Sequence, residues 1–289
     1  MSEPTERPTP FGVRLRAAMA EHGPLCAGLD PHRGLVEGWG LSYDLAGLER
    51  FALTCVEAFG GTVAAVKPQS AFFEVFGSRG VALLERVVDE LRDAGTLTIL
   101  DVKRGDIGTT MDAYAEAFLG PDAPSPADAV TLSPYLGYGS LRPALDLALA
   151  TGRGAFVLAL TSNPEGPAVQ HAVHDGRSVA AGVVDAAAAD NATARGRGEL
   201  GSIGLVVGAT VGSAVRDLGI DLAASAAPLL APGLGAQGGT AADLAEVFGG
   251  ALDQVLAASS RGILSAGPGV AELRDAVRRE ADGLRVLLG

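Results

Sequence analysis

The sequence predicts a single (β/α)8 barrel, and three observations carry that prediction. Eight short apolar runs alternate with longer segments of helical periodicity. The runs are apolar throughout, as is typical of parallel strands buried on both faces. The length of 289 residues suits one barrel, which usually needs about 250. A doubly wound open sheet is the alternative, but it usually has fewer strands, and no Gly-x-Gly-x-x-Gly motif follows the first run.

The predicted strands and helices follow each other along the chain without a long linker. The strands are Leu25 to Asp30, Val63 to Lys67, Thr96 to Lys103, Ala129 to Ser133, Ala155 to Ser162, Ile203 to Thr210, Pro228 to Pro232 and Val255 to Arg261. From Ile107 to Phe118 the large apolar residues recur at spacings of four, three and four, which places them on one face of a helix. Residues 47–61 and 78–95 have the same periodicity and end near a glycine.

Two segments depart from this alternation. We expect residues 1–289 to form one domain that begins with a loose arm, rich in Pro, Thr and Glu, over roughly residues 1–10. The segment from Asn163 to Gly201 is long for one crossover and contains His171 and His174. A His-x-x-His spacing without a nearby cysteine indicates zinc only weakly, so a solvated surface is the favoured interpretation.

Composition excludes several classes of partner. The chain has 22 basic and 34 acidic side chains, a net charge of −12, which argues against binding to nucleic acid polymers and anionic membranes. Cys26 and Cys55 are too few for a disulfide framework or a Cys-x-x-Cys metal site. The first residues lack the apolar stretch of a secretory signal. We therefore expect a cytoplasmic protein, and a small anionic ligand remains compatible with the charge.

Polar side chains gather at the carboxyl ends of the predicted strands. They include Asp30, Lys67, Asp101, Lys103, Ser162 and Arg261. In a (β/α)8 barrel the active site forms at that end, where the loops after the strands converge. A strand end is also where solvent begins, so each residue alone has an ordinary structural explanation. Their shared position favours a site.

The strongest motif is Asp101-Val-Lys-Arg-Gly-Asp106. Asp101 and Lys103 are two residues apart, so in a strand they point the same way, and we expect them to face the barrel interior with Leu97 and Ile99. The alternative is a salt-bridged strand end with Asp106 as the N-cap of the next helix. Two carboxylates keep an ammonium charged, which suits stabilising and protonating a carbanion better than Schiff-base chemistry. A carboxylate there would also repel a substrate carboxylate until CO2 leaves.

A second motif is the glycine-rich segment 231–240, which follows the seventh predicted strand. Its glycines expose backbone N–H groups at the start of the next helix, an arrangement that binds phosphate. The eighth predicted strand ends in Ser260-Arg261-Gly262, which places a guanidinium nearby. Phosphate sites of these barrels commonly form after strands seven and eight. A merely flexible loop is the alternative.

These motifs resemble those of the orotidine 5′-phosphate decarboxylase family. DVKRGDIGTT is similar to the family's Asp-x-Lys-x-x-Asp-Ile signature, and APGLGAQGG and SSRGIL are similar to its phosphate-gripping loops. KPQSAFFEVFG and LTSNPEG resemble its longer-chain bacterial branch. The matches run in the same order from Asp30 to Arg261. Asp-x-Lys-x-x-Asp alone is shared with sugar-phosphate relatives, and the segment 163–201 is longer than in compact members.

The resemblance implies conversion of orotidine 5′-phosphate to UMP without a metal or cofactor. It implies a homodimer, because in that family the positions of Asp106 and Thr110 enter the partner's site. The catalytic set would be Lys103, Asp101 and Asp106. The implied substrate contacts are Asp30 and Lys67 at the ribose, Ser162 at the pyrimidine, Pro232 near the base, and Gln237, Gly238 and Arg261 at the phosphate.

Two alternatives remain open at this point. One is a magnesium-dependent sugar-phosphate decarboxylase or aldolase of the same superfamily. The other is a non-catalytic sensor of a phosphate-bearing ligand on the same scaffold.

Overall fold

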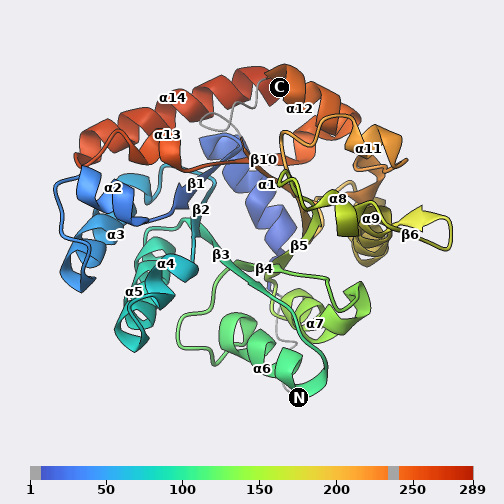
Figure 1. The fold of residues 1–289 in the computed structure, drawn as a ribbon, viewed down its shortest axis with the longest axis horizontal. Coiled ribbons are helices and arrows are strands. Elements are labelled where there is room, and N and C mark those ends of the chain that lie inside the picture. Colours follow the sequence, from blue (N-terminus) through green and yellow to red (C-terminus); the bar gives the residue numbers. More distant parts are fainter. Residues whose placement is uncertain (1–7, 234–240, 289) are drawn as a thin grey trace, which may run out of the picture.

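Eight parallel strands close into a barrel in the order β1-β10-β9-β8-β5-β4-β3-β2. Figure 1 shows strands of the barrel at the centre of the molecule with helices around them. The computed structural model describes residues 8–233 and 241–288. The strands are β1 Leu25–Leu29, β2 Ala65–Pro68, β3 Leu97–Arg104, β4 Ala129–Leu132, β5 Gly154–Leu160, β8 Ile203–Val207, β9 Leu229–Pro232 and β10 Val255–Ser259. The predicted (β/α)8 barrel is therefore confirmed, with each predicted strand at its place in the chain.

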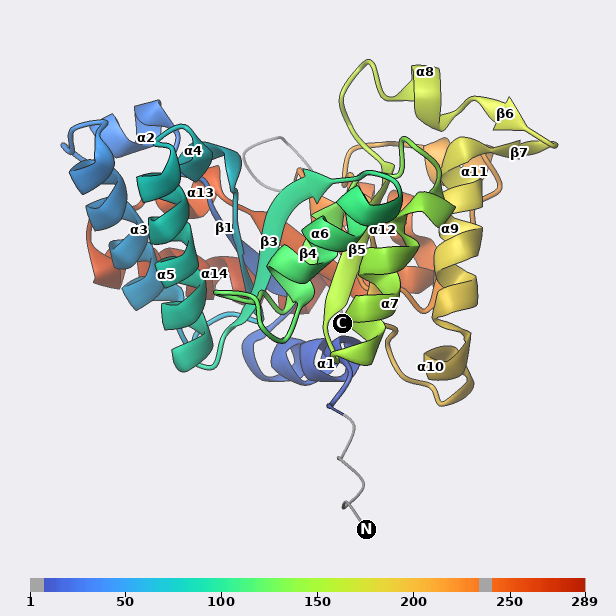
Figure 2. The ribbon, with the colours of Figure 1, turned by 90° about the horizontal axis from the view of Figure 1, so that it is seen from below.

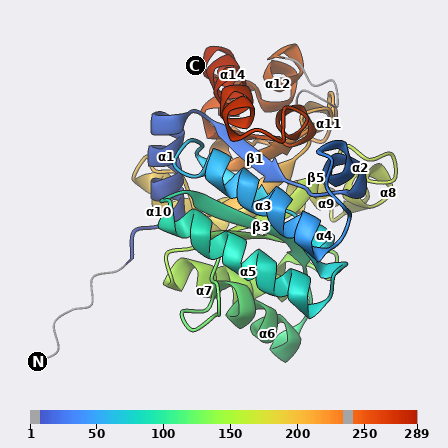
Figure 3. The ribbon, with the colours of Figure 1, turned by 90° about the vertical axis from the view of Figure 1, so that its left-hand side faces the viewer.

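Helices surround the barrel and cover the outer faces of the strands. They are α2 Arg33–Gly38, α3 Leu45–Phe59, α4 Ala71–Glu74, α5 Ser78–Asp93, α6 Gly108–Leu119, η1 Tyr138–Leu141, α7 Arg142–Ala150, α11 Ala214–Asp217, η2 Ala223–Ser225, α12 Ala241–Phe248, η3 Gly249–Gln254, α13 Arg261–Leu264 and α14 Val270–Leu288. Figure 3 shows α14, α3 and α5 side by side on one flank, in agreement with their mutual contacts. The helices predicted for residues 47–61 and 78–95 are confirmed as α3 and α5. None of the helices within the described ranges is long and apolar enough to cross a membrane.

The helix after β3 begins later than the periodicity predicts. Met111 and Leu119 are buried on the inner face of α6, but Ile107 precedes the helix and is 61% exposed. Gly108 has a φ of 51°, a left-handed conformation that starts the helix one residue after Ile107. Placing Ile107 on the buried helical face was therefore wrong.

Two hydrophobic cores lie on opposite sides of the strands. Leu100 and Val102 of β3 pack outward against the helices, whereas Leu97 and Ile99 pack inside the barrel, as their alternation predicts. The helix α1, Phe11–His22, closes the amino-terminal end of the barrel, where Phe11 packs edge-on against Phe156 of β5 at 5.9 Å between ring centroids. Figure 2 shows α1 across that end. The opposite end of the barrel, at the carboxyl ends of the strands, is not covered by α1 and is where we expect a site.

The long crossover after β5 forms an arm of its own. It contains α8 Pro167–Gln170, a small hairpin of β6 Val173–His174 and β7 Arg177–Ser178, then α9 Val179–Asp190 and α10 Ala192–Gly196. Figure 2 shows α8 and the hairpin standing above the carboxyl end of the barrel. The side chain of His174 is 88% exposed there. At its other end the arm is anchored, because Asp190 accepts hydrogen bonds from Arg142 at 2.8 Å and from Tyr138 at 2.6 Å.

Candidate active site

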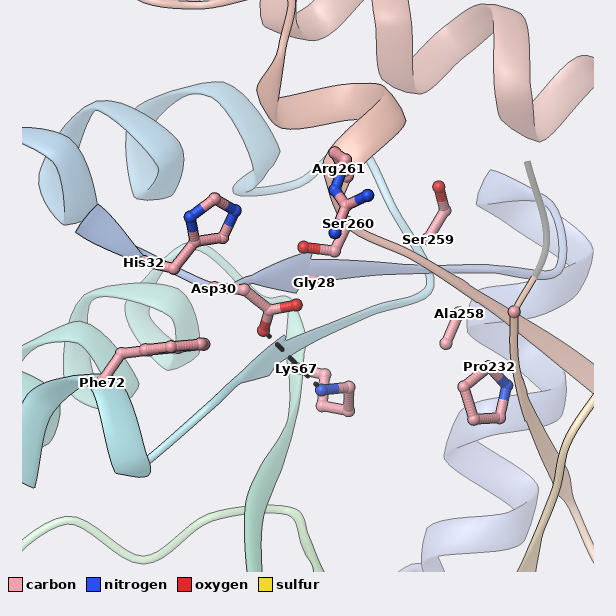
Figure 4. Close-up of a pocket in the computed structure, with 11 residues that line it drawn as sticks. Gly28, Asp30, His32, Lys67, Phe72, Pro232, Ala258, Ser259, Ser260 and Arg261 are labelled. Atoms are coloured by element: carbon pink, nitrogen blue, oxygen red, sulfur yellow. Dashed lines mark ion pairs between the residues drawn. The ribbon is translucent and has the colours of Figure 1, made fainter. Parts of the chain in front are cut away.

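Asp101 lies at the centre of a charged cluster at the carboxyl end of β3. Asp101 is only 5% exposed. Oδ2 accepts a hydrogen bond from Nζ of Lys67 at 2.8 Å, and Oδ1 accepts one from Nζ of Lys103 at 2.6 Å. Strand β1, which pairs with the β2 strand that carries Lys67, leads into Asp30, whose Oδ1 is 3.9 Å from Nζ of Lys67. Figure 4 shows Asp30 and Lys67 turned toward each other across the cavity. Four predicted site residues are thus brought together.

The charges of this cluster are fixed by its geometry. Burial alone would raise the pKa of Asp101, but the ammonium groups of Lys67 and Lys103 outweigh it and lower the pKa to about 2. Burial would also lower the pKa of Lys67, but the carboxylates of Asp30 and Asp101 outweigh it, and the pKa lies above the usual range of lysine. At neutral pH the site therefore presents an ionised Asp101 and a charged Lys67.

Lys103 occupies a strained position on a strand irregularity. Its φ is 46°, in the left-handed region that lysine rarely adopts. The pairing of β3 with β4 shifts register between Leu100 and Arg104, and bulges of this kind re-aim side chains beside active sites. The side chain of Lys103 is 45% exposed, so its ammonium is held by Asp101 yet accessible from the barrel mouth.

Thr131 of β4 completes this cluster and was not predicted. Its hydroxyl donates to Oδ1 of Asp101 at 2.7 Å and accepts a hydrogen bond from the backbone N–H of Lys103 at 2.9 Å. The signal available in the sequence was a hydroxyl in an otherwise apolar run. Using that signal required the strand register: Ile99 pairs with Ala129, so the inward positions two residues further on are Asp101 and Thr131.

A cavity of about 270 Å³ opens beside the cluster at the carboxyl ends of the strands. It is lined by Gly28, Asp30, His32, Lys67, Phe72, Pro232, Gly233, Ala258, Ser259, Ser260 and Arg261. Figure 4 shows Arg261 and Ser260 on one side of this space and Pro232 on another. The loops after β1, β2, β9 and β10 thus enclose it. Among its lining residues, His32, Phe72 and Ser260 were not predicted as site residues.

Ser162 follows β5 and is exposed at the barrel mouth. It does not line the 270 Å³ cavity. The preceding residue, Thr161, is hydrogen-bonded to Gln170 of α8. Oε1 of Gln170 accepts a hydrogen bond from the backbone N–H of Thr161 at 2.9 Å, and Nε2 of Gln170 donates one to the Thr161 hydroxyl at 2.7 Å. The arm that follows β5 is therefore tied to the strand end that carries Ser162.

Asp106 and Thr110 do not join the cluster within one chain. Oδ1 of Asp106 accepts a hydrogen bond from the backbone N–H of Ile107 at 2.8 Å. In the described part of the chain Asp106 forms no ion pair with Lys67 or Lys103. Thr110 is exposed in the first turn of α6. The N-cap of α6 is Ile107, so the alternative interpretation of Asp106 as N-cap was wrong.

The proposed phosphate loop is described only in part. Gln237 and Gly238 lie outside the described residues, whereas Pro232, Gly233 and Arg261 line the cavity. Among the described residues there is no group of three or more His, Cys, Asp or Glu side chains placed to hold a metal ion.

Fold and site together define a class of protein: a (β/α)8 barrel with a polar cavity and a charged cluster at the carboxyl ends of its strands is the architecture of barrel enzymes. The chain belongs to the orotidine 5′-phosphate decarboxylase / HUMPS family, whose model matches residues 23–276.

Individual relatives agree with that assignment over nearly the whole chain. Orotidine 5′-phosphate decarboxylase of Streptomyces coelicolor is 60% identical over 278 residues, which cover 96% of this chain and 97% of the relative. The enzyme of the same name from Salinispora arenicola is 60% identical over 279 residues, covering 96% and 98%. Among solved structures, OMP decarboxylase of Leishmania donovani is 29% identical and superposes with a TM-score of 0.74, covering 96% of this chain and 98% of the other.

Proposed function

We propose that this chain decarboxylates orotidine 5′-phosphate to UMP, the activity named for its relatives at 60% identity. The observation that carries the proposal is the ionised Asp101 held between the ammonium groups of Lys67 and Lys103 at the barrel mouth. Its low pKa keeps a negative charge beside the place where a substrate carboxylate would lie. A cavity with Arg261 on one side adjoins this cluster.

The cavity suits a nucleotide whose phosphate and base lie at different ends. The phosphate would bind Arg261 and the loop that contains Gln237 and Gly238, since a guanidinium and backbone N–H groups both bind phosphate. The ribose hydroxyls would contact Asp30 and Lys67, which line the cavity beside Asp101. We propose that Pro232 packs near the base and that Ser162 hydrogen-bonds the pyrimidine, because Pro232 ends β9 and Ser162 follows β5 at the barrel mouth.

The chemical step breaks the bond between C6 and the carboxylate carbon. The carboxylate leaves as CO2, and the bonding electron pair stays on C6. The ammonium of Lys103 stabilises that carbanion and transfers a proton to C6, which gives UMP, and the resulting amine regains a proton from water. Binding of the distant phosphate and ribose supplies the energy that holds the substrate carboxylate against Asp101, and departure of CO2 relieves the repulsion.

We further propose a cytoplasmic homodimer in which each chain, residues 1–289, is one domain. Asp106 and Thr110 would extend into the partner's site. This is supported by the exposure of Thr110 and by the lack, within the described residues of one chain, of an ion pair between Asp106 and either site lysine. Asp106 would then provide a second carboxylate beside the partner's Lys103.

The test follows the loss of orotidine 5′-phosphate absorbance with and without EDTA. Wild-type turnover should be unaffected by EDTA, whereas a magnesium-dependent sugar-phosphate enzyme would be inhibited. Lys103→Ala should abolish turnover and leave UMP binding largely intact. Arg261→Ala is the matched control, because it should chiefly weaken substrate binding. Robust turnover by Lys103→Ala would refute the assignment of the proton donor. Tight nucleotide binding by the wild type without UMP formation would favour the sensor function.

A further inference from the structure

The hydroxyl of Thr131 occupies the gap that the strand irregularity leaves between β3 and β4. The two strands pair regularly at Ile99 with Ala129 and at Leu100 with Val130, and pairing resumes only at Arg104 with Leu132. Within the gap, the backbone N–H of Lys103 donates to Oγ1 of Thr131 at 2.9 Å. A side chain thus accepts the hydrogen bond from this N–H, which would otherwise be left unpaired at a strained backbone position.

The two hydrogen bonds of Thr131 fix the direction of its hydroxyl proton. Its oxygen accepts the N–H of Lys103, so its own proton points to Oδ1 of Asp101, 2.7 Å away. The same Oδ1 accepts the ammonium of Lys103 at 2.6 Å. One hydroxyl therefore holds the backbone of the lysine and the carboxylate that orients its side chain. Thr131 is 1% exposed, so water has little access to replace either bond.

We propose that Thr131 is a positioning residue for decarboxylation, whose hydroxyl holds Lys103 in its left-handed conformation and aims its ammonium at the reacting carbon through Asp101. This inference rests on the proposed function. Thr131 is 1% exposed and both hydrogen bonds of its hydroxyl join it to Lys103 and Asp101, so it acts through these neighbours rather than on the substrate. Proton transfer depends steeply on the alignment of donor and acceptor, whereas binding of the phosphate and ribose at Arg261 and Asp30 does not depend on this hydroxyl.

The test compares Thr131→Val, which keeps the volume and removes the hydroxyl, with Thr131→Ser, which keeps the hydroxyl. Thr131→Val should lose about 100-fold in kcat, the effect expected from a displacement of about 1 Å at the reacting group. Its KM and its UMP affinity by calorimetry should equal those of the wild type, because only an interaction of the transition state is lost. Thr131→Ser should retain most of the wild-type kcat.

The outcomes separate this inference from the proposed function. If the wild type forms no UMP, the proposed function fails. If the wild type turns over and folded Thr131→Val matches it in kcat, the positioning role is wrong. Equal losses of kcat in Thr131→Val and Thr131→Ser would also overturn it, because they would show that keeping the hydroxyl does not preserve turnover. Should Thr131→Val fail to bind UMP through misfolding, Thr131→Ala decides between the same outcomes, because it removes the hydroxyl without introducing a larger group.

Discussion

The indole N–H of Trp39 donates a hydrogen bond of 2.9 Å to the backbone carbonyl of Leu264. Trp39 directly follows α2, the helix after β1, and Leu264 ends α13, the one-turn helix that begins at Arg261. The indole also stacks on Phe51 of α3 at 4.0 Å. The hydrogen bond from Trp39 to Leu264 ties the loop that carries Asp30 to the turn that carries Arg261. One buried side chain therefore holds two sides of the cavity together.

Replacing Trp39 by Phe should therefore destabilise the protein. The carbonyl of Leu264 would lose its buried donor, which costs about 1–3 kcal/mol, and the smaller ring would leave a void. Urea unfolding of the unliganded chain measures this as a lower midpoint with an unchanged slope. Val286→Ala is the control, since Val286 is 86% exposed and should change stability by less than about 0.5 kcal/mol. Equal midpoints for the two variants would contradict the prediction.

Asp101 should make stability depend on pH in a defined acidic window. Its pKa falls from 3.8 to about 2 on folding, so its contribution is complete above 3.8 and is lost as the pH falls to about 2. The contribution amounts to about 2 kcal/mol, since each pKa unit corresponds to about 1.4. In Asp101→Asn, the free energy of unfolding should fall less steeply over that window than in the wild type. Parallel curves would show that Asp101 does not contribute.

Lys67 should be more important for stability than an exposed cation. Its side chain is 11% exposed, and it lies between Asp30 and Asp101. Lys67→Met would leave buried carboxylate charge with less compensation, which costs about 3–5 kcal/mol for a broken buried pair. Arg33→Met is the control, because it breaks the ion pair between Arg33 and Glu37, whose side chains are 65% and 52% exposed. Loss of this exposed pair should cost less than about 1 kcal/mol. Chemical denaturation at pH 7 measures the free energy of unfolding of both variants. A similar loss in Lys67→Met and Arg33→Met would contradict the prediction.

Much of the fold could be predicted because the signals are local. Strands buried on both faces are continuously apolar, and the alternation of β3 correctly placed Ile99 inside the barrel and Val102 outside. The same alternation brought Asp101 and Lys103 to one side. The start of α6 could not be predicted from periodicity, because it depends on the left-handed conformation of Gly108.

The sequence predicted which residues belong to the site where their charge stands out, but not how they are arranged. Charged residues at strand ends stand out in an apolar sequence, which is how Lys67 and Asp101 were found. Their mutual distance depends on the register of β2 against β3, which no local pattern determines. Thr131 was not predicted for the same reason. A buried threonine has no distinguishing signal in the sequence, and only the shifted register places it against Asp101 and Lys103.

The shared site of the proposed homodimer can be tested by mixing two inactive variants. Lys103→Ala lacks the proton donor, whereas Asp106→Ala lacks the carboxylate that we propose reaches the partner's site. A mixed dimer would contain one site with both defects and one with neither. Random reassembly of equal amounts should therefore restore roughly a quarter of the wild-type activity, because half of the dimers are mixed and each has one intact site. If both residues acted within one chain, the mixture would stay as inactive as its components, and sedimentation would then show whether a dimer exists at all.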